Sequence, residues 1–532
     1  MKSLNQRQGL SVFLSGILAV LSLLLLFPGH LAINTHEVDV LHAVDAAFRL
    51  SSGARQHIDF MSPWGALAFA PIAWLLDFGL TIDAAFVASN ILVAILFLPA
   101  IIHVCHGRLG RFGPVFGVLL LILTTALIYG NDQAAVSMSM YYNRWAWMIT
   151  FLIVLIVLRP AAGPTPRIDG VILGFGLGFL ALTKMTYFLT LVPVVGIALL
   201  TDRNWTALTV MVITGLIVAL LATLAFGGLQ FWAAYAGDLM LVQASDTRPY
   251  PGKSLPDTIA GLDRVMGTLA YLAAVIALRK TGHMREGLLL LLFAPGFIFI
   301  TYQNWGNDPK WLMLLAVLAL IWADETAEKP VFGTNGRMVF TVVSVAALVL
   351  ILPTVMNLAL SPFRNIAVDT AKYMPLLADP AHAGLMVDRK RSFTPLAQIH
   401  LDIAPDPLAE DLPDPVKLGT VTLPECEQAA GYLAKMNEIA RTLEASGHRG
   451  KHVLLVDVIN PLHLIGDFQL VPTQAPWYYG GEPGLDTADL VIVPRCPIGN
   501  APFKRMIREL DKRADTWTET GGDTHFRVFS PR

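Results

Sequence analysis

The first 360 residues alternate between long apolar runs and short polar segments, which is typical of a chain that crosses a membrane many times. A hydrocarbon core needs about 20 apolar residues per helix. The run 64–80 is ambiguous, because it starts at Pro63, contains Pro71 and is interrupted by Asp77. The runs predicted to span are 10–33, 84–104, 114–130, 145–158, 170–182, 187–200, 207–226, 265–278, 286–301, 311–323 and 338–358.

The distribution of basic residues indicates whether the run 64–80 crosses the membrane, since cytoplasmic loops carry an excess of Lys and Arg. If this run stays at the membrane surface and the N-terminus is cytoplasmic, the inner loops hold twelve basic residues and the short outer loops hold eight. If it spans, the inner loops hold eight basic residues and the outer loops hold twelve, which is the opposite of the usual distribution. We therefore predict about eleven spans, a cytoplasmic N-terminus and a C-terminus on the outside. The twelve are Lys2, Arg7, Arg108, Arg111, Arg159, Arg167, Arg203, Arg279, Lys280, Arg285, Lys329 and Arg337.

From about Ser361 the pattern becomes polar and contains no spanning run. Short apolar runs at 453–458 and 489–494 predict buried strands, and alternation over 525–529 predicts an edge strand. Helical spacing over 425–445 and at 503–510 predicts two helices. The fold class is therefore an α-helical polytopic membrane domain, residues 1–360, followed by an extracytoplasmic α/β domain, residues 361–532.

The composition agrees with a membrane protein and narrows the class further. Apolar residues make up 55% of the chain and charged residues 15%, against about 25% charged in a soluble domain. The net charge of −2 gives no indication of a nucleic-acid partner. The first run is too long for the core of a signal peptide, so we expect a retained anchor. Of three cysteines, Cys426 and Cys496 lie in the outer domain, where they form either a disulfide or two buried thiols.

Acidic residues in the outer loops are the first candidates for chemistry. Asp39 follows the first apolar run and lies where a carboxylate ionises without burial in lipid. It can act as a proton acceptor, or it is simply one of several polar loop residues. Asp39 and His42, three residues apart, share a helix face and form a weak candidate metal site. Asp59 either aligns a phosphate or acceptor or caps a helix starting near Pro63. Asp132 is a further carboxylate on the same side.

Three basic residues on the outer side are candidates for binding a lipid phosphate. Lys184 interrupts an apolar hairpin, where a charge is costly unless it faces water or a ligand. Arg144 lies between aromatic residues, and Lys310 lies beside Trp311. Guanidinium and ammonium groups both bind phosphate. The alternative for Lys184 and Arg144 is a side chain that extends to the head-group region without a ligand.

The order of several motifs is similar to that of a known family. The elements in order are Asp39, Ala46–Ala47, Gly53, Asp59–Phe60 and Pro63, followed by a Gly-rich run from Gly174 to Lys184. This order resembles the GT-C superfamily of polyprenyl-phosphate-sugar glycosyltransferases. The similarity is closest to bacterial members related to protein O-mannosyltransferases and to the aminoarabinose transferase of lipid A. Val40 stands where many members carry a second acid.

The resemblance implies an inverting transfer of a sugar from a polyprenyl-phosphate carrier to an acceptor outside the cytoplasm. It implies a multi-pass protein of the bacterial inner membrane with a periplasmic C-terminal domain. The acceptor would be an envelope lipid, a glycan or a protein, and the need for a divalent metal ion stays open. Asp39 would be the general base, with Asp59 and Asp132 at the same site. Two alternatives are a secondary transporter or lipid flippase, and a non-catalytic membrane scaffold or sensor.

Overall fold

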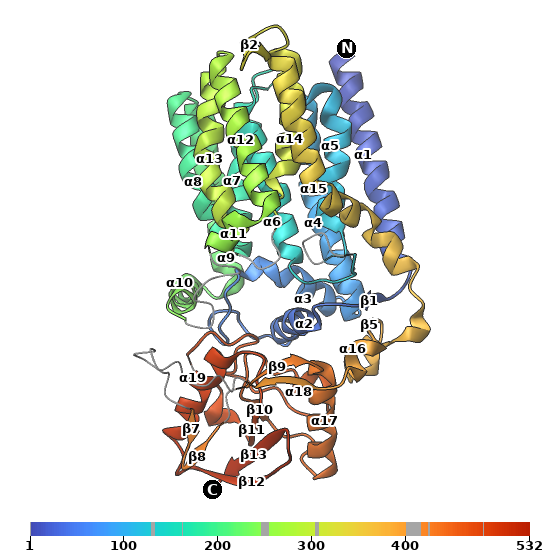
Figure 1. Ribbon diagram of the computed structural model, residues 1–532, viewed down its shortest axis with the longest axis vertical. Helices are drawn as coiled ribbons and strands as arrows, with labels where there is room; N and C mark the ends of the chain where they lie inside the picture. The colour runs from blue at the N-terminus through green and yellow to red at the C-terminus, as the bar shows by residue number, and fades with distance from the viewer. Residues whose placement is uncertain are drawn as a thin grey trace.

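The computed structural model describes residues 2–128, 134–161, 163–245, 255–303, 308–400, 416–423, 426–481 and 483–532. It has an upright bundle of helices and, below one end of the bundle, a mixed α/β region that contains the C-terminus (Figure 1). The N-terminus lies at the opposite end of the bundle (Figure 1). We call residues 367–532 the C-terminal domain and the end of the bundle nearest to it the site end.

Each predicted apolar run overlaps one helix of the bundle. By length and composition, seven of the described helices can cross a membrane. The chain is therefore a mainly helical polytopic membrane protein with a smaller sheet-containing region. The bundle helices are α1 (Lys2–Leu26), α4 (Ile82–Arg108), α5 (Gly113–Thr125), α6 (Tyr141–Leu158), α7 (Pro166–Thr183), α8 (Met185–Thr201), α9 (Trp205–Phe226), α12 (Leu262–Lys280), α13 (Met284–Gln303), α14 (Trp311–Glu325) and α15 (Gly336–Ile366).

The first helix is shorter at its C-terminal end than predicted. It ends at Leu26, not at Ile33, because Pro28 and Gly29 follow and Gly29 takes a positive φ of 64°. The chain then forms β1 (Leu31–Ile33), which pairs in parallel with β5 (Leu385–Asp388) of the C-terminal domain. The predicted boundary at residue 360 therefore does not separate two independent units.

The segment 64–80 does not cross the bundle, as predicted. It contains α3 (Ala70–Asp77), whose eight residues are only about 12 Å long. Both ends of the segment lie at the site end. The amide of Gly65 donates to the carbonyl of Thr183 at the end of α7 (3.2 Å), and the amide of Ile82 donates to Nδ1 of His382 (3.3 Å).

Glycines spaced four residues apart on α7 let this helix pack closely against α9. A Cβ on Gly174 would lie 2.3 Å from the carbonyl oxygen of Met211, and one on Gly170 would lie 2.7 Å from that of Ala207. Such contacts are typical of small residues at helix interfaces in membranes. The Gly-rich run that leads to Lys184 thus has a packing role.

The C-terminal domain contains a four-stranded sheet of order β10-β11-β13-β12. The first two strands are parallel, and the other pairs are antiparallel. The buried strands predicted at 453–458 and 489–494 and the helix predicted at 503–510 are confirmed. The strand predicted over 525–529 is present, but it is not an edge strand, because β13 pairs with both β11 and β12. The helix predicted over 425–445 begins only at Tyr432, because residues 426–430 form a strand. The elements are β10 (Val453–Leu455), β11 (Leu490–Pro494), β12 (Trp517–Gly522), β13 (Phe526–Pro531), α17 (Tyr432–Ala445) and α19 (Asn500–Asp511). Of the two possibilities for Cys426 and Cys496, the structure has the disulfide.

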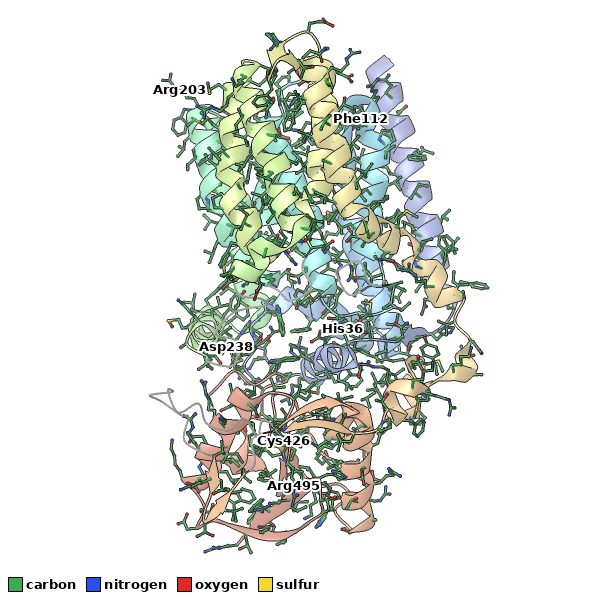
Figure 2. All side chains as sticks on the ribbon, viewed as in Figure 1. His36, Phe112, Arg203, Asp238, Cys426 and Arg495 are labelled. Atoms are coloured by element: carbon green, nitrogen blue, oxygen red, sulfur yellow. A yellow bond between two sulfur atoms is a disulfide. The ribbon has the colours of Figure 1, made fainter. Side chains whose placement is uncertain are left out.

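Three further helices shape the site end. α2 (Glu37–Ser51) and α10 (Leu229–Gln243) lie across this end of the bundle, and α16 (Arg389–Phe393) lies beneath α2 in the C-terminal domain (Figure 1). The side-chain view places His36 and Asp238 at this level, Phe112 and Arg203 at the opposite end, and Cys426 and Arg495 in the C-terminal domain (Figure 2).

Candidate functional site

A cavity of about 710 Å³ lies between the site end of the bundle and the C-terminal domain. Its wall combines parts of α2, α8, α10 and α13 with two aromatic residues of the C-terminal domain. The wall includes His36, Asp39, His42, Trp64, Ser139, Tyr142, Lys184, Leu189, Gln243, Phe299, Gln303, Trp477 and Tyr479.

Asp39 lies in the first turn of α2 and faces this cavity. A helix N-terminus carries a partial positive charge, which stabilises a nearby carboxylate. The hydroxyl of Ser139 donates a hydrogen bond to Oδ2 of Asp39 over 2.6 Å, so the carboxylate has a fixed orientation. His42, one turn further along, lines the same cavity. The prediction that Asp39 and His42 share a helix face is confirmed.

His36 precedes α2 and also lines the cavity. Its backbone is left-handed, with φ 58° and ψ 38°, which is uncommon for a residue with a side chain. Burial lowers the pKa of the His36 imidazole, although the charges of Asp39 and Glu37 oppose this effect. A neutral imidazole therefore lies beside Asp39 at the N-terminus of α2.

The opposite side of α2 is bound to the C-terminal domain. Arg391 of α16 donates to both carboxylate oxygens of Glu37. Asp45 accepts from Nε of Arg49 at 2.8 Å and lies 3.3 Å from Nε2 of His463. Burial alone would raise the pKa of Asp45, but Arg49 and His463 outweigh it and hold that pKa well below its usual range. α2 is thus fixed by charged groups on one side and presents Asp39 on the other.

Lys184 enters the same cavity from the bundle. It lies between α7 and α8 in an extended conformation, with φ −149°, which turns the chain from one helix into the next. Its side chain is buried, and its Nζ lies over the ring of Tyr142, 5.6 Å from the ring centroid. Asp39 and Lys184 are therefore one carboxylate and one ammonium group on the wall of one cavity.

Aromatic rings connect the two parts of the wall. Tyr142 lies 5.4 Å from Trp64, Trp64 lies 4.5 Å from His42, and His42 lies 5.3 Å from Trp477, between ring centroids. We call these four residues the aromatic strip. The strip runs from the ring beneath Lys184 to the C-terminal domain.

One side of the cavity is apolar and reaches the outer surface of the bundle. Leu189 of α8 and Phe299 of α13 both line the cavity, yet they are 60% and 47% exposed. Large apolar side chains on the outside of a membrane helix face lipid tails. The cavity therefore borders the lipid-facing surface beside α8 and α13.

Two of the predicted carboxylates are not shown to belong to this site. Asp59 is not part of the cavity wall. It accepts from Nε and Nη2 of Arg55 at 3.0 and 2.8 Å on the protein surface, and these bonds lower its pKa. It also does not cap a helix near Pro63, since it accepts its backbone hydrogen bond from the amide of Arg55. Asp132 lies outside the described residues.

Arg144 and Lys310 also do not line the cavity. Arg144 is fully buried, and its guanidinium donates to the backbone carbonyls of Ile128 and, at 2.8 Å, of Ala126. Lys310 is buried too, with its ammonium group bound to the carboxylate of Asp308. Both charged groups bind other groups of the chain inside the protein. Neither a phosphate-binding role nor a position in the head-group region therefore fits these two residues. Among the predicted basic residues, Lys184 is the one that reaches the cavity.

In the part of the chain that the structure describes, no third potential metal ligand converges with Asp39 and His42. Among the described residues, three or more potential ligand atoms converge only at His283, Glu286 and Glu325, at the opposite end of the bundle. There Arg159 donates to Glu286 at 3.2 Å and to Glu325 at 2.9 Å, so this group is compensated by a cation of the chain.

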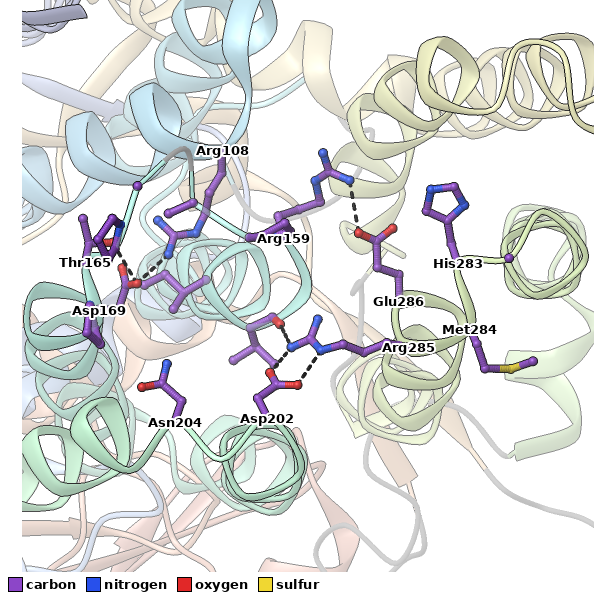
Figure 3. Close-up of a pocket in the computed structure, with 18 residues that line it drawn as sticks. Arg108, Arg159, Thr165, Asp169, Asp202, Asn204, His283, Met284, Arg285 and Glu286 are labelled. Atoms are coloured by element: carbon purple, nitrogen blue, oxygen red, sulfur yellow. Dashed lines mark hydrogen bonds and ion pairs between the residues drawn. The ribbon is translucent and has the colours of Figure 1, made fainter.

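That end holds a second cavity, of about 630 Å³, whose charged residues bind one another (Figure 3). Arg108 donates to Asp169 at 2.7 Å, and Arg285 donates to Asp202 at 2.7 Å. These pairs connect the ends of α4, α7, α8 and α13. They stabilise the helix ends and leave the first cavity as the candidate functional site.

Sequence reasoning missed Ser139, Trp477 and Tyr479. Ser139 carries no sequence signal of its own. The run Trp477–Tyr479, followed by Gly480 and Gly481, is an aromatic cluster in a polar domain and could have been noticed. Comparison with protein-family models, curated proteins and solved structures gives no significant match.

Proposed function

We propose that this chain is an integral membrane glycosyltransferase that moves a sugar from a polyprenyl-phosphate carrier to an extracytoplasmic acceptor, with inversion. The observation that carries the proposal is the position of Asp39 and Lys184 in one cavity bordered by lipid-facing helices. A lipid-linked donor needs both an apolar groove for its tail and a polar pocket for its head group. The resemblance of the Asp39–Pro63 segment to the GT-C superfamily supports the same function.

In the proposed reaction, Asp39 is the general base. It takes the proton of an acceptor hydroxyl while that oxygen forms a bond to the anomeric carbon. The bond from the anomeric carbon to the phosphate oxygen breaks, and the phosphate leaves with the electron pair. A base on the face opposite to the leaving group gives inversion, as in inverting hydrolases. The hydrogen bond from Ser139 orients the carboxylate.

Lys184 stabilises the leaving phosphate in this proposal. Its ammonium group is buried beside Tyr142, where water screens charge less than it does at a surface. A fixed cation at the position where negative charge develops lowers the barrier. Asp59, Arg144 and Lys310 have no part in this mechanism, because their charged groups have other partners outside the cavity.

The proposed orientation has eleven spans, a cytoplasmic N-terminus and the C-terminal domain outside the cytoplasm, in a bacterial inner membrane. The helix ends and loops remote from the C-terminal domain carry Arg108, Arg159 and Arg285 among the inner basic residues. The disulfide between Cys426 and Cys496 supports an oxidising compartment for the C-terminal domain.

Mass spectrometry tests the proposal even though the identity of the sugar is open. Envelope lipids and glycans are compared between cells with the gene, without it, and with a gene that encodes Asp39→Asn. We expect a glycosylated polyprenyl phosphate to accumulate, and one sugar modification to disappear, both without the gene and with Asp39→Asn. Identical lipid and glycan profiles in all three would overturn the proposed function.

A further inference from the structure

We propose that the aromatic strip binds the sugar ring of the donor, and that Trp477 of the C-terminal domain sets sugar specificity. This inference rests on the proposed function. It makes the C-terminal domain part of the substrate site, since the strip is incomplete without Trp477. The ligand class is a pyranose that presents an apolar face of C–H groups.

The order of groups along the cavity wall supports this assignment. Lys184, the candidate for the phosphate, lies over Tyr142 at one end of the strip. From there Trp64, His42 and Trp477 follow with centroid separations of 4.5 to 5.4 Å. A sugar attached to a phosphate at Lys184 would therefore extend along aromatic rings. Ligand pockets commonly combine such apolar and aromatic walls with a few polar groups.

The strip differs from the aromatic belt of a membrane protein. Belt residues lie on the outer surface at the level of the lipid head groups. Tyr142 and His42 are 7% and 4% exposed, and all four residues line the cavity. Their packing against one another leaves Trp64 and Trp477 partly exposed toward the cavity. These rings are thus available to a molecule inside the cavity.

Polar groups for the sugar hydroxyls lie on the same wall. Gln243 of α10 and Gln303 of α13 both line the cavity. The side-chain oxygen of Gln303 is buried and has no hydrogen-bond partner among the described residues. A buried amide oxygen without a partner is costly, so a ligand hydroxyl that donates to it would be favoured.

The loop that carries Trp477 is held in place from both sides. Nη1 of Arg49 in α2 donates to the carbonyl of Pro472 at 3.0 Å. Within the C-terminal domain, the amide of Tyr478 donates to the carbonyl of Val458 at 2.8 Å, and Nη1 of Arg505 donates to the carbonyl of Tyr479 at 2.9 Å. A loop whose backbone is held in this way loses little conformational freedom on binding, which favours selectivity.

The test measures binding to the full-length protein in lipid nanodiscs by saturation-transfer NMR. The probes are a panel of methyl glycosides, the matching sugar 1-phosphates, and undecaprenyl phosphate as the sugar-free lipid. The variants are Trp477→Leu, which keeps an apolar side chain, and Trp477→Phe, which keeps an aromatic ring. Trp74→Ala is the matched control, because Trp74 lies at the same end of the bundle but is 45% exposed and does not line the cavity.

We expect Trp477→Leu to weaken binding of glycosides and sugar phosphates about tenfold, with undecaprenyl phosphate binding unchanged. Trp477→Phe should retain much of the affinity and change the order of preference among sugars. Unchanged sugar binding by Trp477→Leu, or binding of the lipid but of no sugar by the wild type, would overturn this inference and leave the proposed function standing. A wild type that binds neither lipid nor sugar would overturn the proposed function itself.

Discussion

Arg391 and Glu37 form a bidentate ion pair that joins the C-terminal domain to α2, the helix that carries Asp39. The Nε and Nη2 atoms of Arg391 lie 2.8 to 3.1 Å from the carboxylate oxygens of Glu37. Glu37 is almost fully buried, whereas Arg391 is partly exposed. Two acids of one helix turn thus have different roles. Glu37 fixes the helix, and Asp39 faces the cavity.

Substitution of Arg391 by Ala should therefore disturb the position of Asp39. A buried carboxylate that loses its partner costs about 1–3 kcal/mol, and more if it stays charged. We expect a lower midpoint of thermal unfolding and a lower kcat with little change in KM for the donor. Lys390→Ala, on the exposed side of the same helix α16, is the control. Equal effects of the two substitutions would show that the ion pair does not position α2.

Acid should weaken the attachment of α2 through Asp45. The pKa of Asp45 is lower in the folded protein than in the unfolded chain, so the folded state is favoured while the carboxylate is ionised. This stabilisation is fully present above the unfolded pKa of about 4 and is lost as the pH falls below it. Denaturant unfolding between pH 6 and pH 3 should show a steeper loss for the wild type than for Asp45→Asn.

The control for the acid series is Asp515→Asn, which changes an exposed carboxylate of the C-terminal domain. Its unfolding should follow the wild type at every pH. At neutral pH, Asp45→Ala should cost about 3–5 kcal/mol, since it leaves the buried charge of Arg49 without a carboxylate and with backbone carbonyls as its hydrogen-bond acceptors. Parallel pH profiles for the wild type and Asp45→Asn would contradict the role given to Asp45.

The contact between α7 and α9 should not tolerate a methyl group at Gly174. The added Cβ would lie 2.3 Å from the carbonyl oxygen of Met211, so the helices must separate. We expect Gly174→Ala to cost about 1–3 kcal/mol, as overpacking does elsewhere. Gly196→Ala is the matched control, since nothing lies within 4 Å of its added Cβ and Ala is the better helix former. Equal thermal stability of both variants would refute the close contact.

Cysteine labelling should distinguish the disulfide from free thiols. Alkylation of the denatured protein before reduction should modify one cysteine, Cys105, and alkylation after reduction should modify three. Mass spectrometry of the intact protein gives the count. Replacement of both Cys426 and Cys496 by Ser should cost about 2–5 kcal/mol, because the bond constrains the unfolded chain. Three labelled cysteines without reduction would remove the disulfide and its support for an oxidising compartment.

The helices of the bundle could be predicted from the sequence, because long apolar runs are what a membrane-spanning helix requires. The distribution of basic residues also predicted that the segment 64–80 does not cross the bundle. The end of α1 was misplaced by several residues, because an apolar run continues through Pro28 and Gly29 into β1. Hydropathy does not distinguish a spanning helix from a buried strand that pairs with β5.

The candidate site was predictable only in part. Asp39 was predictable because it follows the first apolar run, at the boundary between lipid and water, and Lys184 because a charge within an apolar hairpin is costly unless it faces water or a ligand. The partners of Arg144 are carbonyls of Ala126 and Ile128, which no side-chain pattern reveals. Trp477 joins the cavity from a part of the chain remote in sequence, through the docking of the C-terminal domain on α2.

The most direct test of the central claim compares transfer rates of Asp39→Asn and Asp59→Asn in proteoliposomes that contain the glycosylated polyprenyl phosphate identified in the gene-deletion cells. The two substitutions remove the same charge, one inside the cavity and one on the surface beside Arg55. We predict that Asp39→Asn reduces transfer by about 10²–10⁴-fold, the usual contribution of a general base, while Asp59→Asn transfers close to the wild-type rate. Wild-type transfer by Asp39→Asn, or an equal loss in both, would contradict the account.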